Sequence, residues 1–81
     1  MRNEASKIPG FGDRLKDARL DAELTQQSVA DELGLTIRTY QRYEAGTTEP
    51  TLNHLVSLCI TLDVSADYLL GLADEERAGG R

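Results

Sequence analysis

The sequence is poor in the residues from which metal sites and disulfides are built. Its 81 residues include one Cys, Cys59, and one His, His54, whereas a zinc site takes about four ligands from Cys, His or carboxylate. A single Cys forms no internal disulfide, so packing must hold the fold, as is usual in a reducing compartment. These absences predict a protein without a metal ion, a cofactor or a disulfide.

Long apolar runs are absent as well. No segment approaches the roughly 20 apolar residues that cross a bilayer. The N-terminal segment MRNEASKIPG lacks the basic-then-apolar order of a signal peptide. We therefore expect a cytoplasmic protein with no membrane contact. Its short chain predicts a single domain with a small core.

Catalytic motifs are missing too. His54 and Ser57 are three residues apart, so one helix face would bring a base near a hydroxyl, but no third group is placed to orient them. Gly10 and Gly12 are not followed by the Gly-Lys-Ser/Thr of a phosphate loop. We expect no enzymatic activity.

The sequence does contain helical periodicity, which is present in its middle and absent from its two ends. Residues 1–10 and 73–81 predict a flexible leader and a flexible tail. Between them, apolar spacings of three and four with Thr, Ser and Gly at the boundaries predict a domain over 11–72. Its helices are expected at about 11–23, 26–33, 37–44 and 52–62, with a short fifth helix after Ser65. No strand pattern occurs, so the predicted fold class is all-α.

The predicted core draws on the third and fourth helices. Tyr40 and Tyr43 share an arc of the third helix that faces inward. The fourth helix carries an apolar stripe that we expect to be the longest in the core: Leu52, Leu55, Val56, Cys59 and Leu62.

Residues 25–46 predict two short helices joined by a tight turn. Thr25 and Thr36 are suited to begin the helices, and Gly34 is suited to end the first one in a left-handed conformation. A connection of about three residues forces a sharp crossing. This is the arrangement of a helix-turn-helix, whose second helix enters the major groove of DNA.

The outward arc of the third helix carries side chains that can read bases. At 100° per residue it presents Ile37, Arg38, Gln41 and Arg42. Arg bonds bidentately to guanine, Gln to adenine, and an apolar group packs on the thymine methyl. Gln26, at the positive end of the preceding helix, is suited to a phosphate. A merely solvated helix face remains the alternative for both Arg residues.

The segments LTQQSVADELGLTIRTYQRYEAG and EPTLNHLVSLCITLDVSADYLLGL resemble the Cro/repressor-type (Xre family) helix-turn-helix regulators over about residues 11–72. The resemblance implies a compact five-helix bundle, the lambda-repressor-like DNA-binding domain. It implies a phosphate contact for Gln26 and a structural pair of Arg19 with Glu44. The positions that it places at or beside the bases are Thr36, Ile37, Arg38, Gln41 and Arg42.

One departure from that family pattern follows the third helix. Relatives often have Lys or Arg there to bind phosphate, whereas this chain has Thr47, Thr48 and Glu49. We retain Thr47 as a DNA-contacting residue that uses its hydroxyl without a charge.

The charge is negative overall but unevenly distributed. The net charge is -5, with 7 basic and 8 acidic residues in 1–46 against 2 and 6 in 47–81. The acidity therefore lies mostly away from the third helix. Few phosphate contacts give weak non-specific binding, so we expect a selective binder of double-stranded DNA with little general affinity.

Energetics favour two copies on one site. Two bidentate Arg contacts discriminate by about 2 to 6 kcal/mol, whereas specific sites need about 4 to 10 kcal/mol. We therefore predict a homodimer on a near-palindromic operator, with an interface on the fifth helix formed by Tyr68, Leu69 and Leu72. The expected outcome is transcriptional repression, while activation stays open.

A second hypothesis is a helix-turn-helix module that binds a protein, such as an antitoxin-like partner or an adaptor. Glu49 and the net charge of -5 favour it. Only nine residues follow Leu72 in this sequence, so we expect little material that could wrap a partner and no effector-binding domain after Leu72.

Overall fold

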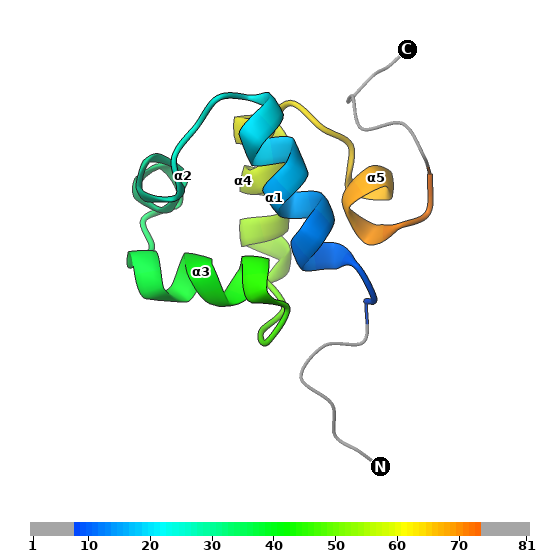
Figure 1. Ribbon diagram of the computed structural model, residues 1–81, viewed down its shortest axis with the longest axis horizontal. Coiled ribbons are helices and arrows are strands. Elements are labelled where there is room, and N and C mark those ends of the chain that lie inside the picture. Colours follow the sequence, from blue (N-terminus) through cyan, green and yellow to red (C-terminus); the bar gives the residue numbers. More distant parts are fainter. Residues whose placement is uncertain (1–7, 74–81) are drawn as a thin grey trace.

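The computed structural model describes residues 8–73 as five helices. They are α1 (Phe11–Asp21), α2 (Gln26–Leu33), α3 (Ile37–Ala45), α4 (Leu52–Leu62) and α5 (Ala66–Leu70), and no strand occurs within 8–73. In the view of Figure 1, α1 passes in front of α4, with α2 and α3 on one side and α5 on the other. The predicted all-α class and the order of five helices are confirmed.

The helix boundaries follow local capping chemistry. The hydroxyls of Thr25, Thr36, Thr51 and Ser65 each accept a hydrogen bond from the backbone N–H three residues later. This contact satisfies one of the free N–H groups at a helix start. Helix α1 ends at Asp21, two residues earlier than predicted, and Glu23 takes a left-handed conformation with φ 61°.

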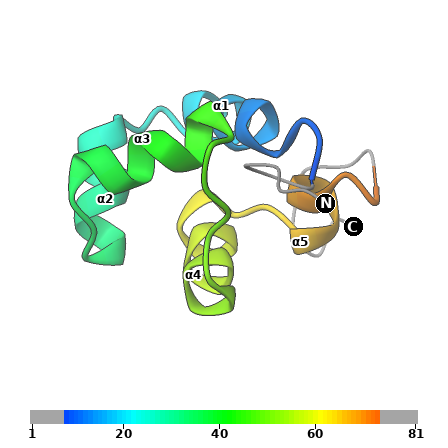
Figure 2. The same cartoon turned by 90° about the horizontal axis from the view of Figure 1, so that it is seen from below.

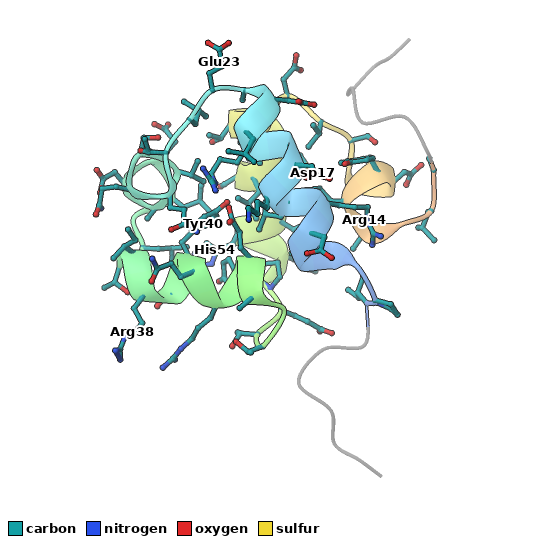
Figure 3. The ribbon with its side chains drawn as sticks, viewed as in Figure 1. Arg14, Asp17, Glu23, Arg38, Tyr40 and His54 are labelled. Atoms are coloured by element: carbon teal, nitrogen blue, oxygen red, sulfur yellow. The ribbon has the colours of Figure 1, made fainter. Side chains whose placement is uncertain are left out.

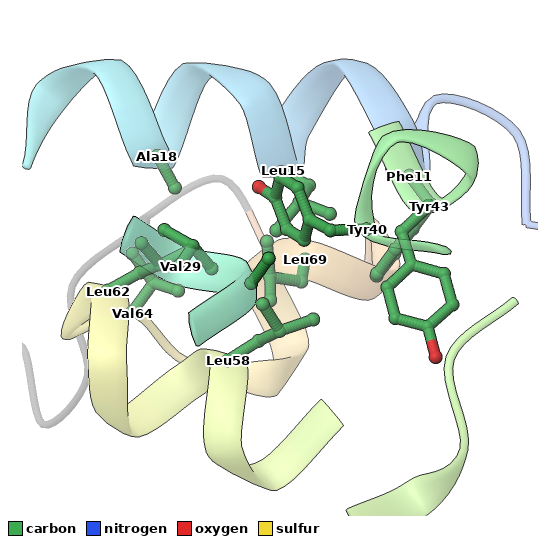
Figure 4. Packing of buried hydrophobic residues seen from close by; sticks show 11 residues of the cluster. Phe11, Leu15, Ala18, Val29, Tyr40, Tyr43, Leu58, Leu62, Val64 and Leu69 are labelled. Carbon is green, nitrogen blue, oxygen red and sulfur yellow. The ribbon is translucent and has the colours of Figure 1, made fainter. Parts of the chain in front are cut away.

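The core lies where α1, α3, α4 and α5 meet. Leu15, Tyr40, Leu58 and Leu69 are fully buried there, and Figure 4 shows their side chains converging between the helices. Val29 of α2 closes the same cluster. The predicted burial of Tyr40 and Tyr43 is confirmed, at 0% and 3% exposure.

The predicted stripe of α4 is wrong in part. Leu62 is buried and Leu55 and Cys59 are half-buried, but Leu52 is 81% exposed and Val56 57% exposed. Leu58, absent from that stripe, is the residue that packs at the centre of the core. Helix α4 carries aliphatic residues on two faces, so spacing alone does not indicate which face turns inward.

The predicted flexible leader also differs at its last residues. Ile8 packs against the hydrophobic core, and the Pro9 carbonyl accepts a hydrogen bond from Arg14 Nη2 at 3.0 Å. Arg14 also donates from Nε to the Leu69 carbonyl at 3.0 Å, which ties the start of α1 to α5. Residues 1–7 and most of the predicted tail, 74–81, lie outside the described residues.

Helices α1 and α3 approach closely at Gly12. A Cβ atom on Gly12 would lie 2.2 Å from the backbone oxygen of Glu44, a distance at which atoms overlap. Gly12 is itself buried at the start of α1. The absence of a side chain therefore sets how closely α3 packs against α1.

None of the helices within residues 8–73 has both the length and the apolar character that a bilayer crossing requires.

Candidate nucleic-acid interface

The α2–α3 pair has the predicted helix-turn-helix form. Only Gly34, Leu35 and Thr36 separate the two helices, and Gly34 ends α2 in the left-handed conformation with φ 72°. This backbone conformation is one that glycine adopts without steric cost. In Figure 1, α2 is seen nearly end-on while α3 lies in the plane of the view, so the two helices cross steeply.

Helix α3 has an inner and an outer face. Tyr40 and Tyr43 pack inward, with their rings edge to face at a centroid distance of 6.5 Å. Arg38, Gln41 and Arg42 are exposed, and Arg38 projects away from the body of the protein in Figure 3. Within residues 8–73, neither Arg side chain forms a hydrogen bond or ion pair. The predicted division of α3 is therefore present in the structure.

At the C-terminal end of α3, the Glu44 carboxylate accepts hydrogen bonds from three elements. Arg19 of α1 donates from Nε at 2.6 Å and from Nη2 at 3.3 Å. The Tyr40 hydroxyl, one turn back on α3, donates to the same carboxylate, and Gln26 of α2 donates from Nε2 at 3.0 Å. The expected pairing of Arg19 with Glu44 is present, and their side chains are 9% and 5% exposed.

This cluster extends to the surface through two glutamines. The Gln26 amide donates to Glu44, and its Oε1 accepts a hydrogen bond from Gln41 Nε2 at 3.1 Å. The contact with Glu44 fixes which end of the Gln26 amide faces inward. Gln26 and Gln41 are thus held by the folded protein before any ligand binds. The sequence predicted that Gln26 and Gln41 lie near DNA, but not that they bond to each other.

The electrostatics of the cluster follow from burial and hydrogen bonding. Burial acts to raise the pKa of Glu44, but the hydrogen bonds from Arg19, Tyr40 and Gln26 outweigh it, so the pKa lies below its ordinary value. The hydrogen bond to Glu44 raises the pKa of Arg19. Burial, together with the hydrogen bond to Glu44, raises the pKa of Tyr40. The carboxylate and the guanidinium therefore remain charged at neutral pH.

The other residues predicted to contact DNA lie around the outer face of α3. Thr36 is exposed at the start of the helix, where its hydroxyl caps the Thr39 N–H, and Ile37 beside it is half-buried. Thr47 is exposed just after the helix, and its hydroxyl donates to the Arg42 carbonyl at 3.4 Å. These three residues border the same surface as Arg38 and Arg42.

The predicted dimer interface on the fifth helix needs correction. Leu69 is fully buried in the core, so its side chain presents no surface to a second copy. Tyr68 is half-buried. Leu72 is 74% exposed but lies beyond the end of α5 at Leu70. The three residues therefore do not form one apolar face.

His54 and Cys59 of α4 are both partly buried. The His54 Nδ1 atom lies 2.9 Å from the Tyr43 hydroxyl, in a side-chain hydrogen bond. Burial raises the pKa of the Cys59 thiol, which disfavours the reactive thiolate. No group of three or more His, Cys, Asp or Glu residues between 8 and 73 is arranged to hold a metal ion.

Comparisons with known proteins agree with this geometry. A family model described as Helix-turn-helix matches residues 15–69. The chain is 47% identical over 60 residues to the uncharacterized HTH-type transcriptional regulator YqaE of Bacillus subtilis, covering 74% of this chain and 52% of that protein. It is 37% identical over 59 residues to the cryptic phage CTXphi transcriptional repressor RstR of Vibrio cholerae, covering 73% and 53%.

A solved structure shares the fold. The P22 c2 repressor, crystallised in complex with a synthetic operator, superposes with a TM-score of 0.72 at 27% identity, covering 78% of this chain and 96% of that chain. The chain spans about half the length of its relatives YqaE and RstR. These relatives are named as transcriptional regulators and not as enzymes. The family match, the crossed α2–α3 pair and the exposed arginines of α3 together show that this chain belongs to the helix-turn-helix family of Cro/repressor-type transcriptional regulators.

Proposed function

We propose that this chain is a cytoplasmic transcriptional repressor that binds a specific double-stranded DNA operator by placing α3 in the major groove. The observation that carries the proposal is the outer face of α3. Its Arg38 and Arg42 guanidiniums are exposed and form no hydrogen bond or ion pair within residues 8–73, while the inner face of the same helix is buried. Both guanidiniums thus remain available for guanine or phosphate.

The contacts that we assign follow the layout of this surface. Arg38 and Arg42 contact bases, and Ile37 packs against a thymine methyl at the N-terminal end of the helix. Gln41 contacts an adenine or an adjacent phosphate in the orientation that Gln26 gives it. Thr36 and Thr47 add hydroxyl contacts to the sugar-phosphate backbone at either end. Gln26 has a second N–H group beside its bond to Glu44, and this group is available to a phosphate.

The operator is expected to be near-palindromic and to bind two copies. Regulators of this geometry place one reading helix in each of two half-sites about one helical turn apart. Phage repressors are the standard example of that arrangement. The P22 c2 repressor, which shares the fold, was crystallised with a synthetic operator. Bound copies that cover a promoter would block polymerase access, which is the repression that we propose.

Selection from a random duplex DNA library at physiological salt tests the function. The purified chain is incubated with the library, and the retained DNA is sequenced. Enrichment of a two-fold symmetric motif supports the proposal and supplies the operator. Enrichment of an asymmetric single site supports DNA recognition and contradicts the symmetric dimer.

A library without enrichment contradicts the proposed function. It favours the second candidate, a helix-turn-helix module that binds a protein such as a toxin partner. The net charge of -5 is the observation that favours this protein-binding candidate. Affinity capture with the chain as bait then becomes the informative experiment.

A further inference from the structure

Helix α4 has a solvent face that the fold does not use. Leu52, Val56 and Ile60 are 81%, 57% and 75% exposed. They are four residues apart, so they form one continuous stripe along the helix. Leu58 and Leu62, on the opposite side of α4, pack in the core. We call the stripe of Leu52, Val56 and Ile60 the α4 face.

The α4 face is a concentrated apolar feature. Five large hydrophobic residues are exposed among residues 8–73, and three of them belong to this one helix. The other two, Leu20 and Leu72, lie on other elements. Single exposed apolar residues are ordinary, whereas a contiguous group indicates an interaction surface.

The charge pattern indicates what covers the α4 face. Helix α4 contains no Asp, Glu, Lys or Arg, although 28% of the chain is charged and its net charge is -5. Two copies of a chain with this charge repel each other. They can approach most closely where neither presents a charged side chain. Among the five helices described within residues 8–73, α4 is the one that contains no charged residue. The charge-free helix is thus suited to a second copy of the same chain.

The position of α4 is compatible with that occupant on DNA. Arg38 projects downward in Figure 3, and Figure 2 views the protein from below. In Figure 2, α4 extends to one side of the protein, away from α1 and α3. A second copy at the neighbouring half-site stands beside the first copy and not above it. A lateral helix can therefore touch the second copy while α3 stays in the groove.

We propose that the α4 face is the surface through which two copies of this chain associate about a two-fold axis. The inference deepens the proposed function, on which it rests, by naming the contact that joins the two copies on the operator. Val56 is the middle residue of the stripe. A two-fold contact centred on the stripe places it against Val56 of the second copy, whichever direction the second α4 runs.

The contact has a characteristic strength and salt dependence. Three aliphatic side chains cover less than the roughly 800 Å² that each partner buries in a standard stable interface. Association is therefore weak in free solution and is completed when adjacent half-sites hold two copies. Salt screens the repulsion between like-charged copies, so added salt strengthens association. Added salt weakens contacts with DNA phosphates, so the two equilibria move in opposite directions.

A charge placed on the α4 face tests the proposal. The two variants of the 81-residue chain are Val56→Asp and Leu20→Asp, which change residues of 57% and 53% exposure on different helices. Sedimentation equilibrium at low and high salt measures self-association, and circular dichroism checks folding. We expect Val56→Asp to weaken association at least tenfold and Leu20→Asp to leave it close to wild type. Equal effects of the two substitutions, or wild-type association in Val56→Asp, would overturn the proposal.

Cross-linking tests the two-fold geometry independently of affinity. Cys59 is first replaced by Ser, and Val56→Cys or Leu20→Cys is added to that background. Oxidised glutathione accepts the two electrons released when two thiols join. We expect Val56→Cys chains to form covalent dimers much faster than Leu20→Cys chains, because a disulfide requires closely spaced Cα atoms. Equal rates contradict a two-fold axis at Val56.

The inference and the proposed function fail in different ways. If Val56→Asp still binds a symmetric operator as two copies with wild-type affinity, the function stands and the α4 contact is wrong. If the wild-type chain selects no DNA motif but the Val56→Cys chains form covalent dimers, the α4 contact stands and the DNA-binding function is wrong. A wild-type chain that is monomeric at high salt and on operator DNA overturns the α4 contact. In that case the α4 face is covered by a different protein or by a segment outside this sequence.

Discussion

The side chains on the two faces of α3 differ in the hydrogen bonds that they form within the protein. On the inner face, the Tyr40 hydroxyl and the Glu44 carboxylate are joined to each other and to α1 by hydrogen bonds. On the outer face, Arg38 and Arg42 extend into solvent without such contacts within residues 8–73. One helix of nine residues therefore separates the groups that maintain the fold from those that we assign to DNA. Substitutions on the two faces are expected to change different measured properties.

The largest effect is expected on the inner face, at the ion pair. Arg19→Ala or Glu44→Ala leaves a buried charge without its partner, since the two side chains are 9% and 5% exposed. Breaking a buried pair in this way costs about 3 to 5 kcal/mol of unfolding free energy. Urea denaturation measures the loss. A double variant should lose less than the sum of the two, because it leaves neither charge stranded. A loss below about 1 kcal/mol in either single variant contradicts a structural role.

The contact between α1 and α3 should also be sensitive to one added methyl group. Gly12→Ala would place a Cβ atom so close to the Glu44 backbone oxygen that the two atoms overlap. Overpacking of this kind costs about 1 to 3 kcal/mol, and the displaced backbone carries Glu44 with it. Thermal denaturation compares Gly12→Ala with Lys16→Ala, an exposed change on the same helix. Equal melting temperatures for Gly12→Ala and Lys16→Ala would show that α1 and α3 can move apart without loss of stability.

The outer face should behave in the opposite manner. Arg38→Ala and Arg42→Ala are each expected to weaken operator binding by about 1 to 3 kcal/mol for each bound copy, or roughly 5- to 150-fold per half-site. Exposed substitutions change stability by no more than about 0.5 kcal/mol. Fluorescence anisotropy on the selected operator measures binding. The matched control is Lys16→Ala, which removes the same charge from α1. Equal weakening by all three variants would indicate a general charge effect in place of base contacts.

The smallest effect concerns acid stability. The pKa of Glu44 lies below its ordinary value of 4.5 in the folded protein. The stabilisation is therefore present above pH about 4.5 and is lost as pH falls through the folded-state pKa. In Glu44→Gln this titration is absent, so its melting temperature should fall less steeply between pH about 5 and about 3. Parallel curves for the two proteins would exclude Glu44 as a source of the acid sensitivity.

The helices could be predicted because their ends are determined locally. Thr25, Thr36, Thr51 and Ser65 each bond a backbone N–H three residues away, so the relevant interaction lies within a few residues of sequence. The orientation of α4 could not be predicted in this way. Its inward face depends on contacts with α2 and α5, and both of its faces are aliphatic. The exposure of Val56 and the burial of Leu69 are outcomes of tertiary packing.

The candidate site shows the same distinction. The outward position of Arg38 and Arg42 follows from helical periodicity, because buried tyrosines mark the opposite arc. The Arg19–Glu44 pair is separated by 25 residues, and only the family resemblance indicated it. The link from Glu44 through Gln26 to Gln41 depends on how α2 crosses α3, which spacing along the chain does not specify.

The most direct test of the outer face is base preference at each operator position. Selection from a random duplex library is repeated with Arg38→Ala and Arg42→Ala, and each motif is compared with that of the wild-type chain. We predict that each variant loses preference at its own symmetric pair of positions and keeps the rest of the motif. Variants that select the wild-type motif unchanged would contradict this prediction, because the exposed arginines of α3 would then read no bases.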